Sequence, residues 1–163
     1  MKNRTLTLSA LGAVVLLWSF GSAAAADPKA EITALEHKLI AATTADEAMT
    51  FQDEKDIVLY DYLVPLQYVG GKAVRADFEK FFSGAKDIKG NFVSLRVVAN
   101  RNLGVANSIQ HFTYTDKDGK PGEGTFRITD AWHKTKDGWK IFHTHVSFPF
   151  NPETGKIEMN LKE

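Results

Sequence analysis

Cysteine is absent from the 163 residues, so the chain can form no disulfide and cannot carry the N-terminal lipid of a lipoprotein. Neither sign of charge is in excess, because 20 Lys and Arg residues balance 20 Asp and Glu residues. The chain therefore offers no broad basic field for nucleic acid. A phosphate loop, a dinucleotide fingerprint and a nucleophile elbow are also missing from the sequence. We expect no nucleic-acid partner and no cofactor.

Long apolar runs are scarce, and the clearest one lies near the N-terminus, from Leu6 to Phe20. Lys2 and Arg4 precede this run, and four alanines that end at Ala26 follow it. This order is typical of a secretory signal peptide, and the run is shorter than the roughly 20 residues of a membrane-spanning helix. We expect residues 1–26 to be cleaved near Ala26, which leaves a periplasmic or secreted protein without a membrane anchor.

The rest of the chain has the size of one domain. Removal of 26 of the 163 residues leaves 137, with 18 basic and 20 acidic residues. A chain of this length can bury a hydrophobic core of its own. We assign residues 27–150 to one domain and residues 151–163 to a polar C-terminal extension.

Three helices are expected before residue 85. The first begins at the N-cap Asp27 and runs to about Ala42, and a capping box of Thr44 and Glu47 starts a short second helix. The third ends near Gly84 and presents a strongly aromatic face. Aromatic residues of this helix and of the later strands are candidates for either the core or a ligand cavity: Phe78, Phe81, Phe82, Phe92, Phe112 and Trp132.

Strands dominate the second half of the chain. A first strand is expected within residues 57–62, followed by a short stretch at 67–69. Four longer strands separated by turn signals follow, at Asn91–Asn100, Gly104–Thr115, Gly124–Lys134 and Trp139–Phe148. Helices followed by an antiparallel meander predict an α+β fold, in which the N-terminal helices cover one face of a curved sheet. We expect a cone-shaped molecule with a pocket inside.

This order of elements and the last hairpin resemble the nuclear transport factor 2-like superfamily, and most closely its SnoaL-like branch. The segments that carry the resemblance are Arg127-Ile128-Thr129, Trp132, Asp137-Gly138-Trp139-Lys140-Ile141 and His143-Thr144-His145-Val146-Ser147. Ketosteroid isomerase-like proteins and the calcium/calmodulin-dependent kinase association domain end in similar patterns. The resemblance covers about residues 28–150.

The resemblance implies a cone-shaped, cystatin-like fold, homodimers formed through the sheet, and a central pocket for a small, largely apolar molecule. It does not imply one activity, because this fold hosts isomerases, cyclases, dehydratases and members that only bind or assemble. Carried over position by position, the pocket residues would be Arg127, Thr129, His143, His145 and Ser147.

Strand periodicity places His143, His145 and Ser147 on one face, together with Trp139 and Ile141. A metal pair of His143 and His145 could be completed by His111 or His133, but the sequence does not fix a third ligand. We therefore expect both histidines to line a pocket as polar groups, without a metal.

The hairpin register decides what faces these histidines. A three-residue loop of Lys136–Gly138 sets Thr129 opposite His145 and Arg127 opposite Ser147, whereas a two-residue loop of Asp137 and Gly138 sets Asp130 opposite His145. The three-residue loop is preferred, because it gathers Phe126, Ile128 and Trp132 against Phe142, Val146 and Phe148 on one apolar face.

In the preferred register Asp130 lies among apolar neighbours, where burial would raise its pKa and suit it to act as a base. Tyr60 and Asp61 near the first strand are further candidates, as a phenolic donor and a base, although an ordinary core aromatic and a solvated carboxylate would also explain them.

The sequence thus leaves two functions open. One is cofactor-free proton transfer, such as isomerisation, cyclisation or dehydration, with His145 or Asp130 moving the proton and Arg127 holding an anionic group. The other is a non-catalytic module that binds a ligand or forms dimeric assemblies. Convergence of the polar groups inside a closed pocket would favour catalysis, and their exposure on the outer sheet face would favour a binding or dimer surface.

Overall fold

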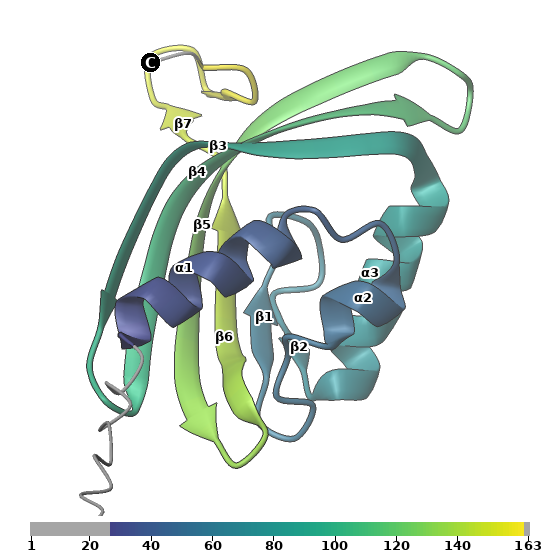
Figure 1. Cartoon of the computed structure of the whole chain (residues 1–163). Helices are drawn as coiled ribbons and strands as arrows, with labels where there is room; N and C mark the ends of the chain where they lie inside the picture. The colour runs from purple at the N-terminus through teal and green to yellow at the C-terminus, as the bar shows by residue number, and fades with distance from the viewer. Residues whose placement is uncertain (1–26, 162–163) are drawn as a thin grey trace, which may run out of the picture.

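The structure, a computed structural model, describes residues 27–161, and the expected signal peptide lies outside these residues. Helix α1 (Pro28–Leu39) and helix α2 (Ala45–Met49) precede the first strand, and helix α3 (Gly71–Gly84) follows the second (Figure 1). The sequence-predicted caps form. The Asp27 side chain accepts a hydrogen bond from the Lys29 amide at 3.1 Å, and Thr44 Oγ1 accepts one from the Glu47 amide at 3.1 Å. No helix within residues 27–161 is long and apolar enough to span a membrane.

Six strands form one sheet in the order β2-β1-β6-β5-β4-β3. Their bounds are β1 Val58–Tyr60, β2 Tyr68–Val69, β3 Ala85–Ala99, β4 Leu103–Asp116, β5 Pro121–Thr135 and β6 Gly138–Ser147. Strands β3 to β6 form the expected antiparallel meander, whereas β1 pairs with β6 in parallel. The α+β class is confirmed.

Strand β3 begins earlier than the sequence pattern predicts, at Ala85, directly after α3. Its first residues lack strand alternation because the register shifts between Lys86 and Lys89, where Asp87 has a φ of 53°. This irregularity explains why the pattern predicted a strand only from Asn91.

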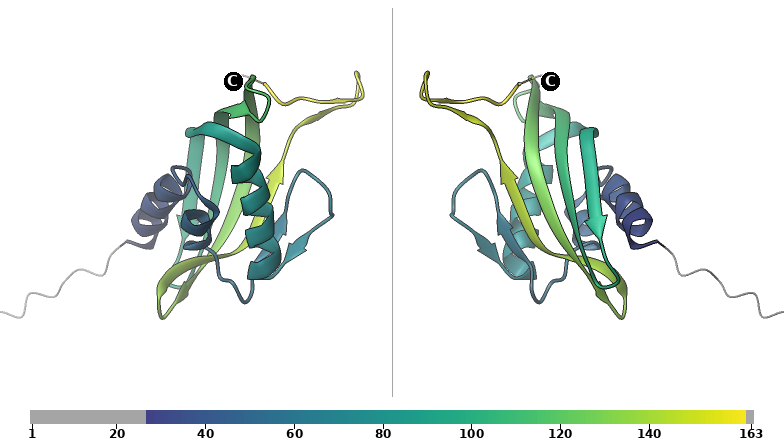
Figure 2. Two further views of the ribbon diagram at one scale, coloured as in Figure 1. Left: turned by 90° about the vertical axis from the view of Figure 1, so that its right-hand side faces the viewer. Right: turned by 90° about the vertical axis from the view of Figure 1, so that its left-hand side faces the viewer.

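The helices lie on one side of the curved sheet, as the two side views show (Figure 2). Strand β4 alternates accordingly: Gly104, Ala106, Ser108 and Gln110 are buried beneath the helices, and the residues between them are more exposed. The core is centred on five almost completely buried side chains: Ile32, Ile57, Val74, Trp132 and Ile141. We call the helix-covered side the inner face and the opposite side the outer face.

The β5–β6 hairpin differs from both registers considered above. Its loop contains two residues, Lys136 and Asp137, because Thr135 pairs with Gly138. A bulge follows, since Trp132 pairs with Ile141 and Ala131 with His143, which leaves Phe142 without a partner. The predicted three-residue loop is therefore wrong.

Beyond the bulge the preferred pairs are present, with Thr129 opposite His145 and Arg127 opposite Ser147. The extra residue also changes which side chains share a face. Ile141 and Trp139 belong to the buried core, whereas His143 and His145 contact Tyr60 on the outer face. The expectation that Trp139 and Ile141 share the face of His143 is thus corrected.

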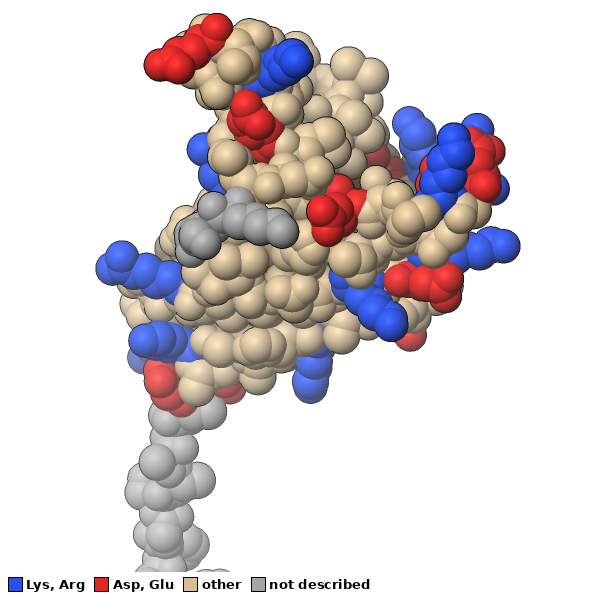
Figure 3. Space-filling view, turned by 90° about the horizontal axis from the view of Figure 1, so that it is seen from above, with Lys and Arg blue, Asp and Glu red and all other residues tan. Residues whose placement is uncertain are grey.

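The C-terminal segment adds a small two-stranded hairpin, β7 (Phe150–Asn151) with β8 (Lys156–Ile157). It returns to the meander where the Met159 carbonyl accepts a hydrogen bond from the Thr125 amide at 2.7 Å. Seen from above, acidic and basic side chains are interspersed over this end of the molecule, and neither sign dominates (Figure 3).

Candidate functional site

A cavity of about 380 Å³ lies between the inner face of the sheet and the helices. Four of the aromatic candidates line it: Phe78, Phe81, Phe82 and Phe112. The other two do not, because Phe92 packs edge-on against His37 and Trp132 is part of the closed core. Aliphatic side chains from α1, β5 and β6 complete a mostly apolar wall, which is typical of small-molecule sites.

Asp130 is the charged residue most deeply buried in this wall, with 2% of its surface exposed. Its Oδ1 atom accepts a hydrogen bond from the Thr144 hydroxyl on the neighbouring strand. Burial raises the pKa of Asp130 to about 6, and the hydrogen bond from Thr144 offsets this only in part. A carboxylate with these properties can accept a proton near neutral pH.

A second carboxyl group, Glu36 on α1, lies behind Asp130 and is 1% exposed. Trp132 Nε1 donates a hydrogen bond to Glu36 Oε1 at 2.7 Å, and Oε2 has no partner. Burial first, and the nearby Asp130 second, raise the pKa of Glu36 to about 9. Glu36 is therefore protonated at neutral pH. Two neighbouring carboxyl groups whose environments separate their pKa values are typical of acid/base sites.

The sequence analysis did not identify Glu36, although one signal was present. Glu36 follows Ile32 by four residues and precedes Leu39 by three, so it lies on the apolar face of the first helix. A carboxyl group in that position has to be buried when the helix packs on the sheet.

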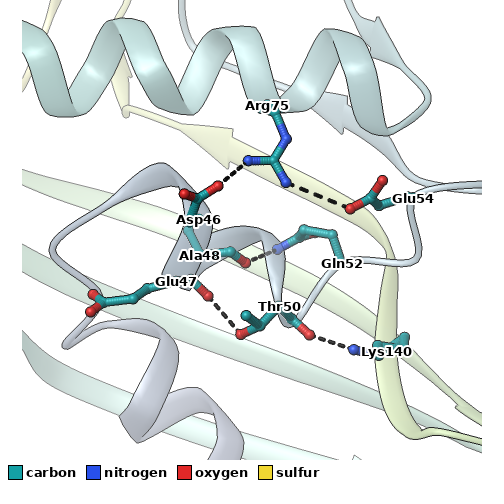
Figure 4. Close-up of polar contacts among 8 residues, drawn as sticks. All are labelled: Asp46, Glu47, Ala48, Thr50, Gln52, Glu54, Arg75 and Lys140. Atoms are coloured by element: carbon teal, nitrogen blue, oxygen red, sulfur yellow. Dashed lines mark hydrogen bonds and ion pairs between the residues drawn. The ribbon is translucent and has the colours of Figure 1, made fainter.

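Two buried amides, Gln52 and Gln110, also line the cavity. Gln52 is 4% exposed, and its Oε1 atom has no hydrogen-bond partner. Gln110 Nε2 donates to Ser108 Oγ at 2.9 Å. The segment that carries Gln52 is held by contacts around α2, where Arg75 pairs with Asp46 and Lys140 donates to the Thr50 carbonyl (Figure 4).

Three further carboxylates lie in less buried parts of the wall, and one of them, Glu123, is exposed. Asp61 directly follows β1, and Asp77 lies on α3. Burial raises the pKa of both side chains, and for Asp61 the negative charge of Asp77 adds to the rise. Both are close enough to Lys80 for its positive charge to lower their pKa in part. We call Asp61 and Asp77 the acidic pair.

Six of the sequence-predicted site residues do not line this cavity. Tyr60 packs edge-on against His143 and His145, with ring centroids 4.9 and 5.9 Å apart. Arg127 donates to the Phe148 carbonyl at 2.9 Å and pairs with Ser147. Thr129 Oγ1 donates to the Asn107 side chain at 3.3 Å.

These six residues share the outer face, whereas Asp130 points to the inner face. The structure therefore separates His145 from Asp130. It also places Arg127 away from any anion that the cavity could hold. In the part of the chain that the structure describes, no three His, Asp or Glu side chains are grouped as metal ligands.

The model of the SnoaL-like domain family matches residues 32–151. No curated protein is similar enough to the chain to count as a match.

Solved structures share the fold. A nuclear transport factor 2-like protein of unknown function from Pseudomonas putida KT2440 is 24% identical, with a TM-score of 0.72, and the match covers 83% of this chain and 96% of that one. A candidate calcium/calmodulin-dependent protein kinase II association domain from Xanthomonas campestris is 25% identical, with a TM-score of 0.64 and coverages of 72% and 84%. A ketosteroid isomerase-like protein from Erwinia carotovora atroseptica is 18% identical, with a TM-score of 0.63 and coverages of 73% and 94%.

Proposed function

Because the chain belongs to the SnoaL-like domain family, we propose that it binds a small, largely apolar molecule in the inner cavity and moves a proton on it, without a cofactor. The main support for this proposal is that the carboxylate of Asp130 is buried in a mostly apolar cavity wall. Removal from water makes a carboxylate a stronger base, and its pKa of about 6 leaves it ionised at neutral pH.

Each polar neighbour has a distinct part in this proposal. The Thr144 hydroxyl orients the Asp130 carboxylate through its hydrogen bond. Glu36 does not line the cavity, so it acts through Asp130 as a positioning residue whose uncharged form lets Asp130 ionise beside it. Isomerisation, cyclisation and dehydration are the reaction types that such a base supports. Asp130, and not His145, is the residue that we assign to proton transfer.

A direct test uses nitrobenzisoxazole, an apolar aromatic probe with an acidic C–H bond. Asp130 would take the proton from carbon, the freed electron pair would break the ring N–O bond, and a coloured cyanophenolate would form. We expect Asp130→Asn to lower kcat/KM for this reaction by about 100-fold or more. Substitution of His145 by Ala on the outer face is the matched control and should leave the rate unchanged.

The pH dependence of the same reaction provides an independent check. Only the ionised form of Asp130 accepts a proton, so the rate should rise with pH and level off above about 6. A rate that is equal in wild type and Asp130→Asn, or that depends on His145, would overturn the assignment.

We also propose that residues 1–26 direct export, on the strength of the basic, apolar and alanine-rich order described above. The full chain expressed in a Gram-negative host should be recovered from the periplasm with Asp27 at its N-terminus, as measured by intact-mass spectrometry. Recovery from the cytoplasm with residues 1–26 retained would contradict export.

A second candidate function, dimeric assembly, is supported by the outer face. A largely apolar row crosses five strands there: Val58, His143, Ala131, Val105 and Val98. Val98 is 59% exposed and Val105 39% exposed. Exposed apolar side chains in a continuous row are typical of association surfaces, and dimerisation through this face would leave the inner cavity free.

A further inference from the structure

The ionisable side chains that line the cavity are mostly acidic. Four carboxylates line it, namely Asp61, Asp77, Glu123 and Asp130, against the single ammonium group of Lys80. Neither arginine nor histidine is found among the described residues of the wall. An anionic ligand would meet net repulsion there, and a cationic one net attraction.

The acidic pair is the place in the wall that best fits a positive charge. Asp61 and Asp77 come from different elements, and both are half-buried in the cavity wall. The raised pKa of both groups reflects the cost of keeping two carboxylates partly out of water. Lys80 can balance only one of the two charges. A second cation, bound between Asp61 and Asp77, would balance the remaining negative charge.

A buried amide without a hydrogen-bond donor is also part of the wall. Gln52 Oε1 is buried in the wall and has no partner within the described residues. A buried amide oxygen without a donor costs free energy until a ligand or a water molecule provides one. Asp130 is part of the same wall, so the wall contains two buried hydrogen-bond acceptors.

Aromatic rings supply the rest of the recognition surface. Tyr62, Phe81 and Tyr114 are part of the same wall as the acidic pair. The faces of such rings attract cations as well as apolar groups. The wall therefore combines an apolar path with negative charge.

We propose that the cavity selects molecules that carry a protonated amine on an apolar body. The amine binds at Asp61 and Asp77, and the apolar body extends along the aromatic wall toward Asp130. This inference rests on the proposed function, because it assigns a ligand class to the same cavity.

The test compares three probes of similar size by isothermal titration calorimetry at neutral pH. Naphthylethylamine is cationic, naphthylethanol is neutral and naphthylacetate is anionic. We expect the amine to bind at least about tenfold more tightly than the alcohol, as charge-assisted hydrogen bonds predict, and the acetate to bind most weakly. The double variant Asp61→Asn/Asp77→Asn should bind the amine and the alcohol equally.

A matched control removes two charges elsewhere, through Asp118→Asn/Glu153→Gln, since both side chains are exposed and outside the cavity wall. This control should keep the preference for the amine. Equal binding of amine and alcohol by the wild type, or an unchanged preference in the Asp61→Asn/Asp77→Asn variant, would overturn the ligand class. The nitrobenzisoxazole reaction, whose probe is neutral, would still test the proposed function separately. Failure of all three probes to bind would overturn the ligand class and also weaken the case for a binding cavity.

Discussion

At the scale of single residues, the buried carboxyl groups have the clearest consequences. Glu36 and Asp130 come from distant parts of the chain and meet beneath α1, where neither has a cationic partner among the described residues. Buried charges without partners are costly, so the pair remains uncharged or singly charged. A core that only had to be stable would favour apolar residues at both positions, which supports a functional reason for the pair.

Substitution of Glu36 tests this environment through stability. The pKa of Glu36 is 4.5 in the unfolded chain and about 9 in the folded chain. Between these two pH values Glu36 is protonated in the folded chain and ionised in the unfolded chain. Because the folded state binds more protons in this range, the free energy of unfolding should fall as pH rises. Glu36→Gln keeps an acceptor for Trp132 and should make that fall shallower, by at most about 1.4 kcal/mol per pH unit.

Urea denaturation at several pH values between about 5.5 and 8 measures this slope. Glu153→Gln, an exposed substitution of the same kind, should leave it unchanged. Equal slopes for wild type and Glu36→Gln would show that Glu36 ionises normally in the folded chain.

At the scale of elements, one bulged residue determines which side chains enter the cavity. Without the bulge at Phe142, side chains spaced by two along β6 would stay on one face. With it, the inner face carries Trp139 and Ile141 before the bulge and Thr144 and Val146 after it. The bulge therefore turns His143 and His145 outward and brings Thr144 to Asp130.

The contact of α1 with the sheet depends on Gly104 in β4. A Cβ atom at this position would overlap Cδ1 of Ile32, which is completely buried. We expect Gly104→Ala to lower the free energy of unfolding by about 1–3 kcal/mol through overpacking. Gly84→Ala, where a Cβ atom would meet nothing within 4 Å, is the matched control.

Thermal or urea unfolding measures both variants. Ile32→Val removes the colliding atom, so the double variant should lose less stability than the two single variants added together. If the stability losses of the two single variants add up to that of the double variant, the overlap between the new Cβ atom and Ile32 is relieved by movement elsewhere.

At the scale of the whole molecule, the sheet separates two surfaces with different properties. The inner face lines a mostly apolar cavity with acidic groups, and the outer face presents the apolar row beside Tyr60 and His145. Ligand binding and assembly can thus occur on opposite sides of one sheet. The two candidate functions are compatible in a single molecule.

Assembly through the outer face predicts a specific effect of charge. Val105→Glu places a carboxylate in the middle of the apolar row and should convert a dimer to a monomer, because its burial at an interface would be unfavourable. Size-exclusion chromatography with light scattering measures the mass. Val64→Glu, in the exposed β1–β2 loop, should remain dimeric. A monomeric wild type, or a dimeric Val105→Glu variant, would exclude this surface as the interface.

The sequence alone determined the fold class, because helix caps, apolar periodicity and turn signals are local patterns. The family was indicated by the resemblance of the element order and the last hairpin to SnoaL-like proteins, and the fold and family comparisons confirm both. The sequence also pointed to Asp130, since its apolar neighbours along the strand are visible in the sequence. It did not determine which face His143 and His145 occupy, because one unpaired residue reverses strand alternation. Only the tertiary structure decided this, and only it brought Glu36 to Asp130 and placed Asp61 and Asp77 in the cavity wall, because packing between distant elements leaves no local pattern.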